Sequence, residues 1–252
     1  MVNFIDRGMC LMKQEERTEL TKERILQAAV QEFGTNGYAA STLNAICNNH
    51  GISKGLLYHN FSGKDELYMA CVSQCFADVT EYLKGEDIQD DLEKYMRIRL
   101  QYFSQNPRYA RIFFEAMLQP PAALSTQIRT LRKDFDAFNR RIYRAALSKV
   151  KLREGFTETD AIEYYEIMQE MFNGYFSSPA YAGKDFQSLV ADHEEKLPKM
   201  LNLMLYGIGE GEQKNECPIA DFAIACRNCA GVYLCGYGQP PAPDCPHLPR
   251  SR

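Results

Sequence analysis

The chain has 252 residues, of which 45% are hydrophobic and 25% are charged, and its formal net charge is −4. This composition is ordinary for a globular protein with a substantial core. No run of about eighteen apolar residues occurs, and the N-terminus lacks the apolar stretch of a secretory signal, so we expect a cytoplasmic protein with no membrane partner.

The first predicted helix covers residues 21–33, where apolar side chains recur at the three- and four-residue spacing of a helix face. Gly34 and Gly37 follow at the position of a C-terminal stop. Residues 1–17, which precede this helix, are assigned to an N-terminal extension.

Two short helices follow, joined by a tight turn. Thr42 begins the first, which continues to about Asn49, and Gly51 breaks it. Ser53 begins the second, which has about one and a half turns and ends near His59. Two short helices joined in this way predict a helix-turn-helix motif, whose second helix enters the major groove of DNA.

A fourth helix is expected after the segment Ser62-Gly-Lys-Asp65, which has the spacing of a capping box, a serine followed three residues later by an acid. Cys71 and Cys75 lie four residues apart on this helix, and we expect them to be buried small hydrophobic residues. The chain has nine cysteines, an odd number, and no export signal, which argues against a disulfide framework for this part.

Long amphipathic segments follow the polar junction KGEDIQDD, and they are separated by proline and glycine. No alternating apolar and polar runs indicate strands. The sequence therefore predicts an all-α protein, with a small N-terminal unit at residues 18–72 and a larger helical domain at residues 73–208. The long helical segments are 92–103, 109–118, 122–150, 157–176 and 186–206.

Charge is distributed unevenly along the chain. The segment from Phe33 to Lys64 contains no Asp or Glu, although the chain has 33 acidic residues. The same segment contains Lys54, Lys64 and two histidines. A surface without acids suits contact with phosphate, and chance within a turn-rich segment is the alternative explanation.

The second helix of the motif carries residues suited to DNA. Lys54 and Gly55 lie at its N-terminal end, where such helices meet base edges. Gly55 weakens the helix by up to about 1 kcal/mol relative to alanine, which suggests close approach to another molecule. Tyr58 and His59 can donate hydrogen bonds to phosphates, and Lys64 lies near the start of the next helix, where backbone N–H groups favour an anion.

The segments RILQAAVQEFGTNGYAASTL and TLNAICNNHGISKGLLYHNFSGKDELY resemble the DNA-binding domain of the TetR/AcrR family of transcription regulators. The resemblance extends from Thr21 to Val72. It implies a ligand-responsive, sequence-specific regulator, in the family's usual sense a repressor, and not an enzyme. Such a protein binds double-stranded DNA as a homodimer on a palindromic operator and is released by a small-molecule effector.

The resemblance also implies roles for individual residues. Thr42 contacts a phosphate, Lys54 and Gly55 lie against base edges, and three residues after them hold the DNA backbone. Leu56 stands where the family often has threonine, which removes one polar contact. The DNA-binding residues implied in this way are Thr42, Ser53, Lys54, Gly55, Tyr58, His59 and Lys64.

In the larger domain, the resemblance places the dimer interface on residues 157–176 and 186–206 and a ligand cavity among the middle helices. Apolar stripes on the two interface helices fit this, and a monomer core is the alternative. One stripe is Ile162, Tyr165, Met168, Gln169 and Phe172, and the other is Leu189, Leu197, Met200, Leu201, Met204 and Leu205. The pocket region is Phe103, Phe113, Phe114, Met117, Phe135, Phe138 and Tyr143, with Arg97, Arg99, Arg111 and Glu115 as polar groups of undecided role.

The tail at residues 209–252 is rich in cysteine, glycine and proline and has three interpretations. It is a zinc or iron–sulfur appendage that senses metal or redox state, a disordered tail, or extra translated sequence, as Met12 resembles a natural start for the family. A thiol oxidoreductase is a rival function, but it needs a βαβ context that this sequence lacks. A helical interaction module without DNA binding is another, and the acid-free segment argues against it. The candidate ligands in the tail are Cys226, Cys229, Cys235 and Cys245.

Overall fold

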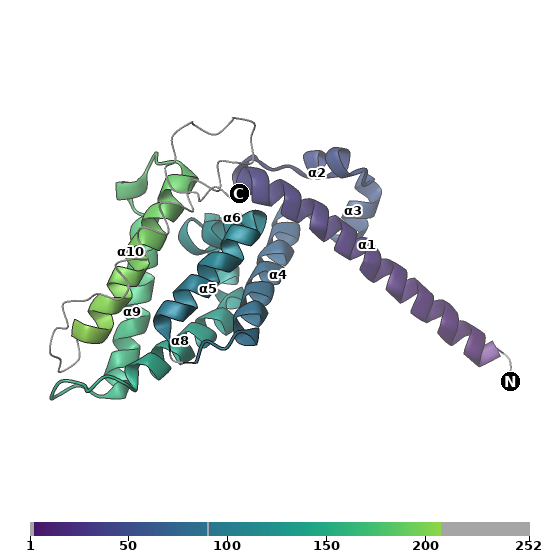
Figure 1. The fold of residues 1–252 in the computed structure, drawn as a ribbon. Helices are drawn as coiled ribbons and strands as arrows, with labels where there is room; N and C mark the ends of the chain where they lie inside the picture. Colours follow the sequence, from purple (N-terminus) through teal and green to yellow (C-terminus); the bar gives the residue numbers. More distant parts are fainter. Residues whose placement is uncertain (1–2, 90, 208–252) are drawn as a thin grey trace, which may run out of the picture.

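The computed structural model describes residues 3–89 and 91–207, with side chains from residue 16 onward. Helices make up most of this part, and it contains no strand, so the predicted all-α class is confirmed (Figure 1). None of the described helices is long and apolar enough to cross a membrane. In chain order they are α1 (Asn3–Ala40), α2 (Leu43–His50), α3 (Lys54–Asn60), α4 (Lys64–Gly85), α5 (Leu92–Gln105), α6 (Pro107–Leu118), η1 (Ala122–Leu124), α7 (Ser125–Leu131), α8 (Lys133–Leu147), α9 (Glu158–Phe176), η2 (Pro179–Tyr181) and α10 (Phe186–Gly207).

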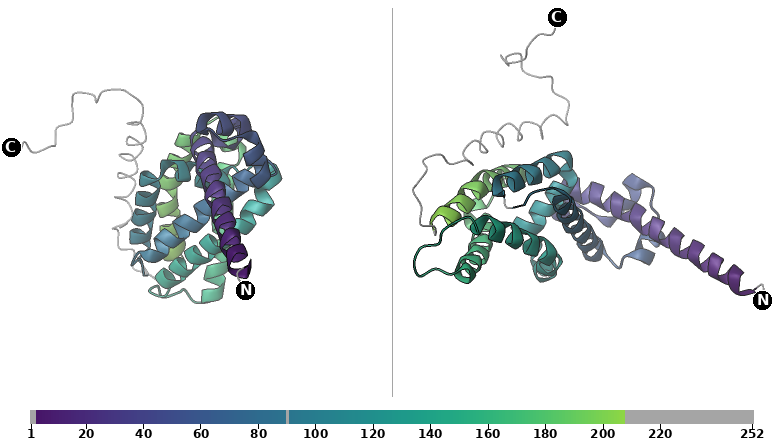
Figure 2. Two further views of the ribbon diagram at one scale, coloured as in Figure 1. Left: turned by 90° about the vertical axis from the view of Figure 1, so that its right-hand side faces the viewer. Right: turned by 60° about the horizontal axis from the view of Figure 1, so that its bottom comes forward.

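Helix α1 is longer than predicted, because it begins within the segment assigned to an N-terminal extension. Its N-terminal part extends away from the other helices (Figures 1 and 2). Gly34 stays within the helix rather than ending it, and a Cβ atom there would lie 2.5 Å from the Cβ atom of Arg108 on α6. The break comes at Gly37, whose φ of 77° is readily adopted only by glycine.

The helix-turn-helix motif has the predicted boundaries. The Thr42 hydroxyl accepts a hydrogen bond from the Ala45 N–H at 3.0 Å and so caps α2. Gly51 ends α2 in the left-handed conformation, with a φ of 61°. Ser53 caps α3 by accepting from the Leu56 N–H at 3.2 Å.

A small core holds the motif together. Ile46 on α2, Ile52 in the turn and Leu57 on α3 are buried. The buried face of α4 includes Cys71 and Cys75, and both are free cysteines. Burial raises the pKa of both thiols, so they act as small hydrophobic residues.

The predicted capping box before α4 is wrong by one residue. The acid that receives hydrogen bonds is Glu66, whose carboxylate accepts from the Ser62 N–H at 2.7 Å and from the Ser62 hydroxyl at 2.5 Å. Asp65 instead accepts a hydrogen bond from the Tyr38 hydroxyl at 2.5 Å. The second predicted capping box, between Thr157 and Asp160, is confirmed at the start of α9.

Helix α4 packs against α1 and against α5, α6, α7 and α8 of the larger domain. Helices α9 and α10 lie at the end of the molecule opposite to α2 and α3 (Figures 1 and 2). The segment predicted as one helix at 122–150 is divided into η1, α7 and α8. Helix α4 crosses the predicted domain boundary at residue 72, and its buried side chains on both sides of that boundary belong to one continuous hydrophobic core.

Candidate functional site

The predicted DNA-contacting residues of α3 lie on its exposed side. On α3, Lys54, Gly55, Tyr58 and His59 are exposed, whereas Leu57 points into the core. Tyr58 is 56% exposed although it is a large aromatic residue. A Cβ atom built on Gly55 would meet no atom within 4 Å, so the space in front of this residue is open. The face is free to approach a flat or grooved partner.

The hydroxyls of Thr42 and Ser53 have a local role that the sequence also predicts. Each accepts a backbone hydrogen bond as a helix cap. Capping uses the oxygen as an acceptor and leaves the O–H to donate. Both residues are exposed, so each can donate to a phosphate oxygen while it caps its helix.

Lys64 is less exposed than the other predicted contacts and has a defined position. Its Nζ lies 4.3 Å from the centroid of the Tyr38 ring and 3.5 Å from the Ala39 carbonyl oxygen. The hydrogen bond from Tyr38 to Asp65, together with partial burial, raises the pKa of Tyr38 to about 12. The aromatic ring therefore stays neutral and holds the lysine at the start of α4.

Arg24 contributes to this region and was missed in the sequence. Its Nη2 donates to the carbonyl oxygens of His50 at 3.4 Å and Gly51 at 3.2 Å. The guanidinium thus joins α1 to the turn that sets the angle between α2 and α3. Arg24 lies 26 and 27 residues before its two partners, and no sequence spacing predicts such a contact. The only signal in the sequence was the basic side chain itself.

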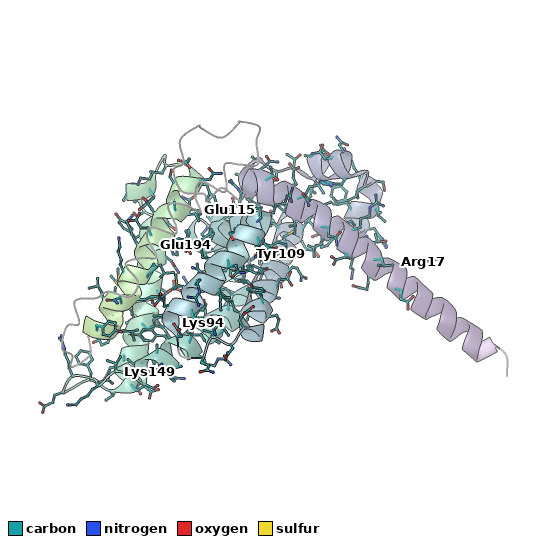
Figure 3. All side chains as sticks on the ribbon, in the orientation of Figure 1. Arg17, Lys94, Tyr109, Glu115, Lys149 and Glu194 are labelled. Atoms are coloured by element: carbon teal, nitrogen blue, oxygen red, sulfur yellow. The ribbon has the colours of Figure 1, made fainter. Side chains whose placement is uncertain are left out.

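Glu115 on α6 joins the larger domain to the DNA-binding unit (Figure 3). Both of its carboxylate oxygens lie 3.0 Å from the Tyr38 N–H, which follows the break at Gly37. The Tyr68 hydroxyl on α4 donates to the same carboxylate at 3.2 Å. Burial raises the pKa of Glu115, and these hydrogen bonds oppose that shift.

The other undecided polar groups divide between surface and interior. Arg97 is exposed on α5. Arg111 on α6 lies over the ring of Phe186 on α10, with 4.5 Å between the guanidinium carbon and the ring centroid. Arg99 is 4% exposed, so a charged side chain on α5 points into the interior of the larger domain.

Arg99 belongs to a buried polar cluster that spans three helices. It makes two hydrogen bonds to Glu194 on α10, at 2.6 and 3.1 Å. His193 lies 2.8 Å from Glu194 through Nδ1 and 3.2 Å from the Asn173 side-chain oxygen on α9 through Nε2. Burial alone would raise the pKa of Glu194, but the Arg99 charge and these hydrogen bonds keep it well below its usual value. Burial lowers the pKa of His193, and Glu194 offsets part of that effect.

The polar cluster borders a small internal cavity of about 30 Å³. Of the predicted pocket region, Phe113, Phe114, Met117 and Phe135 line this cavity. Phe103, Phe138 and Tyr143 are buried near it but do not line it. The lining residues are Tyr95, Arg99, Phe113, Phe114, Met117, Phe135, Asn139, Tyr165, Gln169, Asn173, His193, Leu197 and Leu201.

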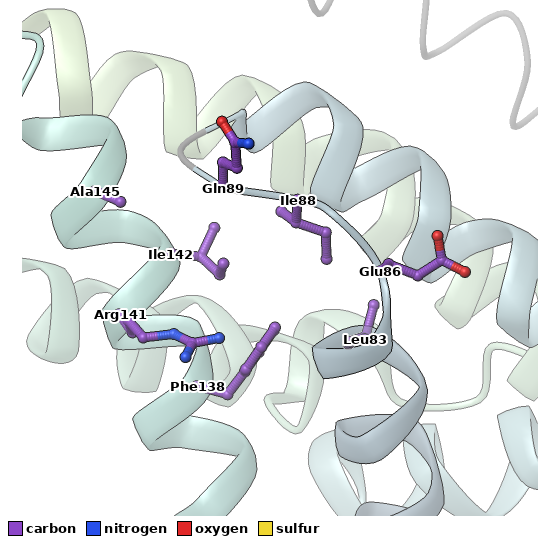
Figure 4. Close-up of a pocket in the computed structure, with 8 residues that line it drawn as sticks. All are labelled: Leu83, Glu86, Ile88, Gln89, Phe138, Arg141, Ile142 and Ala145. Atoms are coloured by element: carbon purple, nitrogen blue, oxygen red, sulfur yellow. The ribbon is translucent and has the colours of Figure 1, made fainter.

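A second cavity, of about 380 Å³, opens between the end of α4, the loop to α5 and α8 (Figure 4). Ile88 and Phe138 supply apolar surface, and Arg141 supplies a charge at the edge. This volume falls within the range of about 300–1,000 Å³ that is usual for small-molecule sites, whereas the internal cavity holds about two water molecules. The Phe138 side chain of the predicted pocket region lines this second cavity.

Most residues of the apolar stripes assigned to a dimer interface are buried inside the monomer, and Met168, Gln169 and Met200 are half-buried. Tyr165 and Phe172 on α9 and Leu201 on α10 are buried, so the interpretation as a monomer core is correct for them. A different apolar stripe on α9 is exposed. Its positions precede those of the predicted stripe by one residue along the chain. Its exposed side chains are Tyr164 at 53%, Ile167 at 45%, Met171 at 63% and Tyr175 at 50%, and α10 adds Leu203 at 68% and Tyr206 at 59%.

The candidate metal ligands of the tail, Cys226, Cys229, Cys235 and Cys245, lie outside the described residues. The interpretation of that segment as a metal or redox site therefore stays a prediction.

Comparison with known proteins supports the DNA-binding interpretation. Residues 25–71 match the family model of bacterial regulatory proteins of the tetR family, and residues 86–208 match the tetracyclin repressor-like C-terminal domain. The regulator UidR of Escherichia coli K12 is 32% identical over 108 residues, which is 41% of this chain and 55% of UidR. The biofilm-operon negative regulator IcaR of Staphylococcus epidermidis is 26% identical over 110 residues, covering 43% and 59%. The chain thus spans about half the length of these curated relatives.

A solved structure shows the same fold. The repressor SmeT of Stenotrophomonas maltophilia superposes with a TM-score of 0.53 over 90% of this chain and 99% of its own, at 21% identity. The two family models together match well over half of the chain. The chain therefore belongs to the TetR family of bacterial regulatory proteins, which are helix-turn-helix, DNA-binding regulators of transcription.

Proposed function

We propose that this regulator binds a palindromic operator as a homodimer, represses transcription there, and is released by a small-molecule effector. The observation that carries the proposal is the exposed face of α3, which carries Lys54, Gly55, Tyr58 and His59, with no other atom within 4 Å of a Cβ built on Gly55. Lys54 and Gly55 meet base edges, and Thr42, Ser53, Tyr58, His59 and Lys64 hold the phosphate backbone.

The dimer forms through α9 and α10. Tyr164, Ile167, Met171 and Tyr175 recur at helical spacing on the exposed side of α9, and apolar surface of this extent marks an interaction site. A two-fold axis through these helices leaves both copies of α3 free at the opposite end. Two recognition helices then meet half-sites about 34–36 Å apart on one face of the DNA.

The effector acts through the larger domain by shifting a conformational equilibrium. A ligand that binds better to the state with unsuitable spacing of the two α3 helices lowers operator affinity by its differential affinity for the two states. Glu115 and Gly34 attach α6 directly to α1, so movement of α6 reaches the DNA-binding unit. We propose repression rather than activation because IcaR is named as a negative regulator and SmeT as a repressor.

A gel-shift experiment with the DNA upstream of the protein's own gene tests this function. We expect a retarded complex that survives an excess of random DNA, since specific sites are typically bound about 10³–10⁷ times more tightly than non-specific ones. The matched control is the same fragment with Lys54→Ala protein. Absence of any shift at low salt, with folded dimeric protein, would refute the proposal.

A further inference from the structure

The buried cluster beside the internal cavity can adopt only certain net charges. With Arg99 charged, Glu194 ionised and His193 neutral, its net charge is zero. Arginine does not lose its proton in proteins, and the Arg99 charge keeps Glu194 ionised. Protonation of His193 is the remaining change, and it raises the net charge to +1. The cluster can therefore compensate a buried anion but not a buried cation.

The surroundings of His193 are compatible with both protonation states. Both of its ring nitrogens face oxygen atoms, one of Glu194 at 2.8 Å and one of Asn173 at 3.2 Å. An imidazolium donates to both oxygens at once, and a neutral ring donates to Glu194 and accepts from Asn173 once that amide turns over. Arg99 on α5 is the other charged group that faces it, and the tyrosines Tyr95 and Tyr165 line the same cavity.

Aromatic rings surround Arg99, whose two Nη atoms already hold the carboxylate of Glu194. Its guanidinium carbon lies 5.5–5.8 Å from the ring centroids of Phe103, Phe113 and Phe114. A cation in such apolar surroundings binds anions more strongly than one in water, and arginine pairs well with planar carboxylates. A cavity of about 30 Å³ accommodates a head group rather than a whole effector.

We propose, on the basis of the function inferred above, that the effector is an organic carboxylate whose head group binds in this cavity beside Arg99 and His193. Binding is coupled to the uptake of one proton from solvent by His193. The ligand charge of −1 and the imidazolium charge of +1 cancel, so the interior stays neutral. A neutral effector needs no such proton, and a cationic effector has no compensating group.

Three probes of nearly equal shape test the charge requirement: acetate, acetamide and acetamidine, at constant ionic strength. Binding to the full chain is measured by isothermal calorimetry in Hepes and in Tris, whose heats of ionisation differ. We expect acetate to bind with an uptake of about one proton and acetamidine not to bind. The acetate dissociation constant falls by up to about tenfold per pH unit as the pH is lowered, within the window where His193 gains its proton.

Single substitutions distinguish the role of His193 from that of Arg99. His193→Gln keeps a polar side chain but cannot take up a proton, so acetate binding loses its proton uptake and its pH dependence. Arg99→Gln weakens acetate binding by about tenfold or more, the usual effect of removing a charged hydrogen-bond partner. Arg97→Gln, on the exposed side of the same helix, is the matched control and leaves binding unchanged. The double variant Arg99→Gln/Glu194→Gln replaces the single variant if an unpaired Glu194 prevents folding.

Several results overturn the inference. Acetamide binding as tightly as acetate, acetate binding without proton uptake, unchanged acetate binding in the Arg99 variants, or no acetate binding at 50 mM would each do so. The operator experiment is independent of all of them. If the chain binds acetate with uptake of a proton but never binds DNA, the anion site is supported and the proposed function is refuted.

Discussion

Two lysines of the DNA-binding unit have the same charge but different surroundings. Lys54 is exposed at the start of α3, whereas Lys64 is half-buried, with its Nζ over the Tyr38 ring. An exposed lysine at a recognition-helix N-terminus can adjust to a base edge. A lysine that is held in place by an aromatic ring is better suited to a phosphate, whose position does not depend on sequence.

The two lysines should therefore differ when removed. Lys64→Ala should weaken binding to operator and random DNA alike and reduce the slope of log K against log salt by about 1. Lys54→Ala should alter the preference among operator sequences, at a cost of about 1–3 kcal/mol for the cognate base. Fluorescence anisotropy over a salt series measures both. Equal losses on specific and random DNA for Lys54→Ala would contradict a base contact.

His193 should make stability depend on pH. Burial holds its folded-state pKa below the unfolded value of about 6.5, so the unfolded chain binds more protons as the pH falls. Its contribution is present above that value and is lost as the pH falls from about 6.5 toward the folded-state pKa, by up to about 1.4 kcal/mol per pH unit. Urea unfolding at several pH values should show a shallower slope for His193→Gln than for the unaltered chain. Identical slopes would show that folding does not lower the pKa of His193.

Local contacts were predictable and distant ones were not. Thr42, Gly51 and Ser53 act within four residues of their partners, so their residue types alone predict the caps and the turn. Glu66 replaced Asp65 as the capping acid because Tyr38, far away in sequence, occupies Asp65. The roles of Arg99 and Glu115 depend on helices that lie far apart in the chain and could not be predicted.

At the scale of helices, glycines have opposite consequences in α1 and α3. Gly37 has a φ of 77°, and a Cβ atom there would lie 2.7 Å from Nη2 of Arg111. Gly55 is helical, and a Cβ atom there would meet nothing. The first glycine is required by the fold, whereas the fold offers no reason for the second.

Substitution of these glycines by alanine should thus change stability in opposite directions. Gly37→Ala should lower the free energy of unfolding by about 1–2 kcal/mol, because the left-handed conformation is strained with a side chain. Gly55→Ala should raise it by up to about 1 kcal/mol through helix propensity, and should weaken DNA binding by blocking the approach of the base edges. Denaturant titration and anisotropy measure the two effects. A Gly55→Ala variant with undiminished DNA affinity would remove Gly55 from the interface.

Helix periodicity predicted which segments are helical but not which face each helix buries in the assembly. Residues 157–176 were correctly predicted as one helix, since the Thr157 cap and the apolar spacing agree. The exposed stripe is displaced by one residue from the predicted one, because both faces of α9 are apolar. A sequence with two apolar faces does not say which face meets the monomer core and which meets another molecule.

For the whole molecule, the exposed apolar stripe on α9 predicts the oligomeric state. Met171→Glu places a charge in the centre of that stripe and should convert the dimer to a monomer, since a buried unpaired charge is strongly unfavourable. Light scattering after size exclusion measures the mass, and operator binding should be lost with it. Leu20→Glu, at an exposed leucine on α1 that is 71% accessible, is the matched control. A dimeric Met171→Glu protein would show that association uses another surface.

The contact between α6 and α1 has a consequence for the modular evolution of such regulators. Gly34 admits Arg108 at a distance that no side chain allows, and Glu115 receives the Tyr38 N–H beyond the break. A DNA-binding unit from a relative could therefore be joined to this sensor only if its first helix carried a glycine at the positions of Gly34 and Gly37. Exchange of recognition specificity should proceed more easily by substitutions on α3 than by recombination of whole domains.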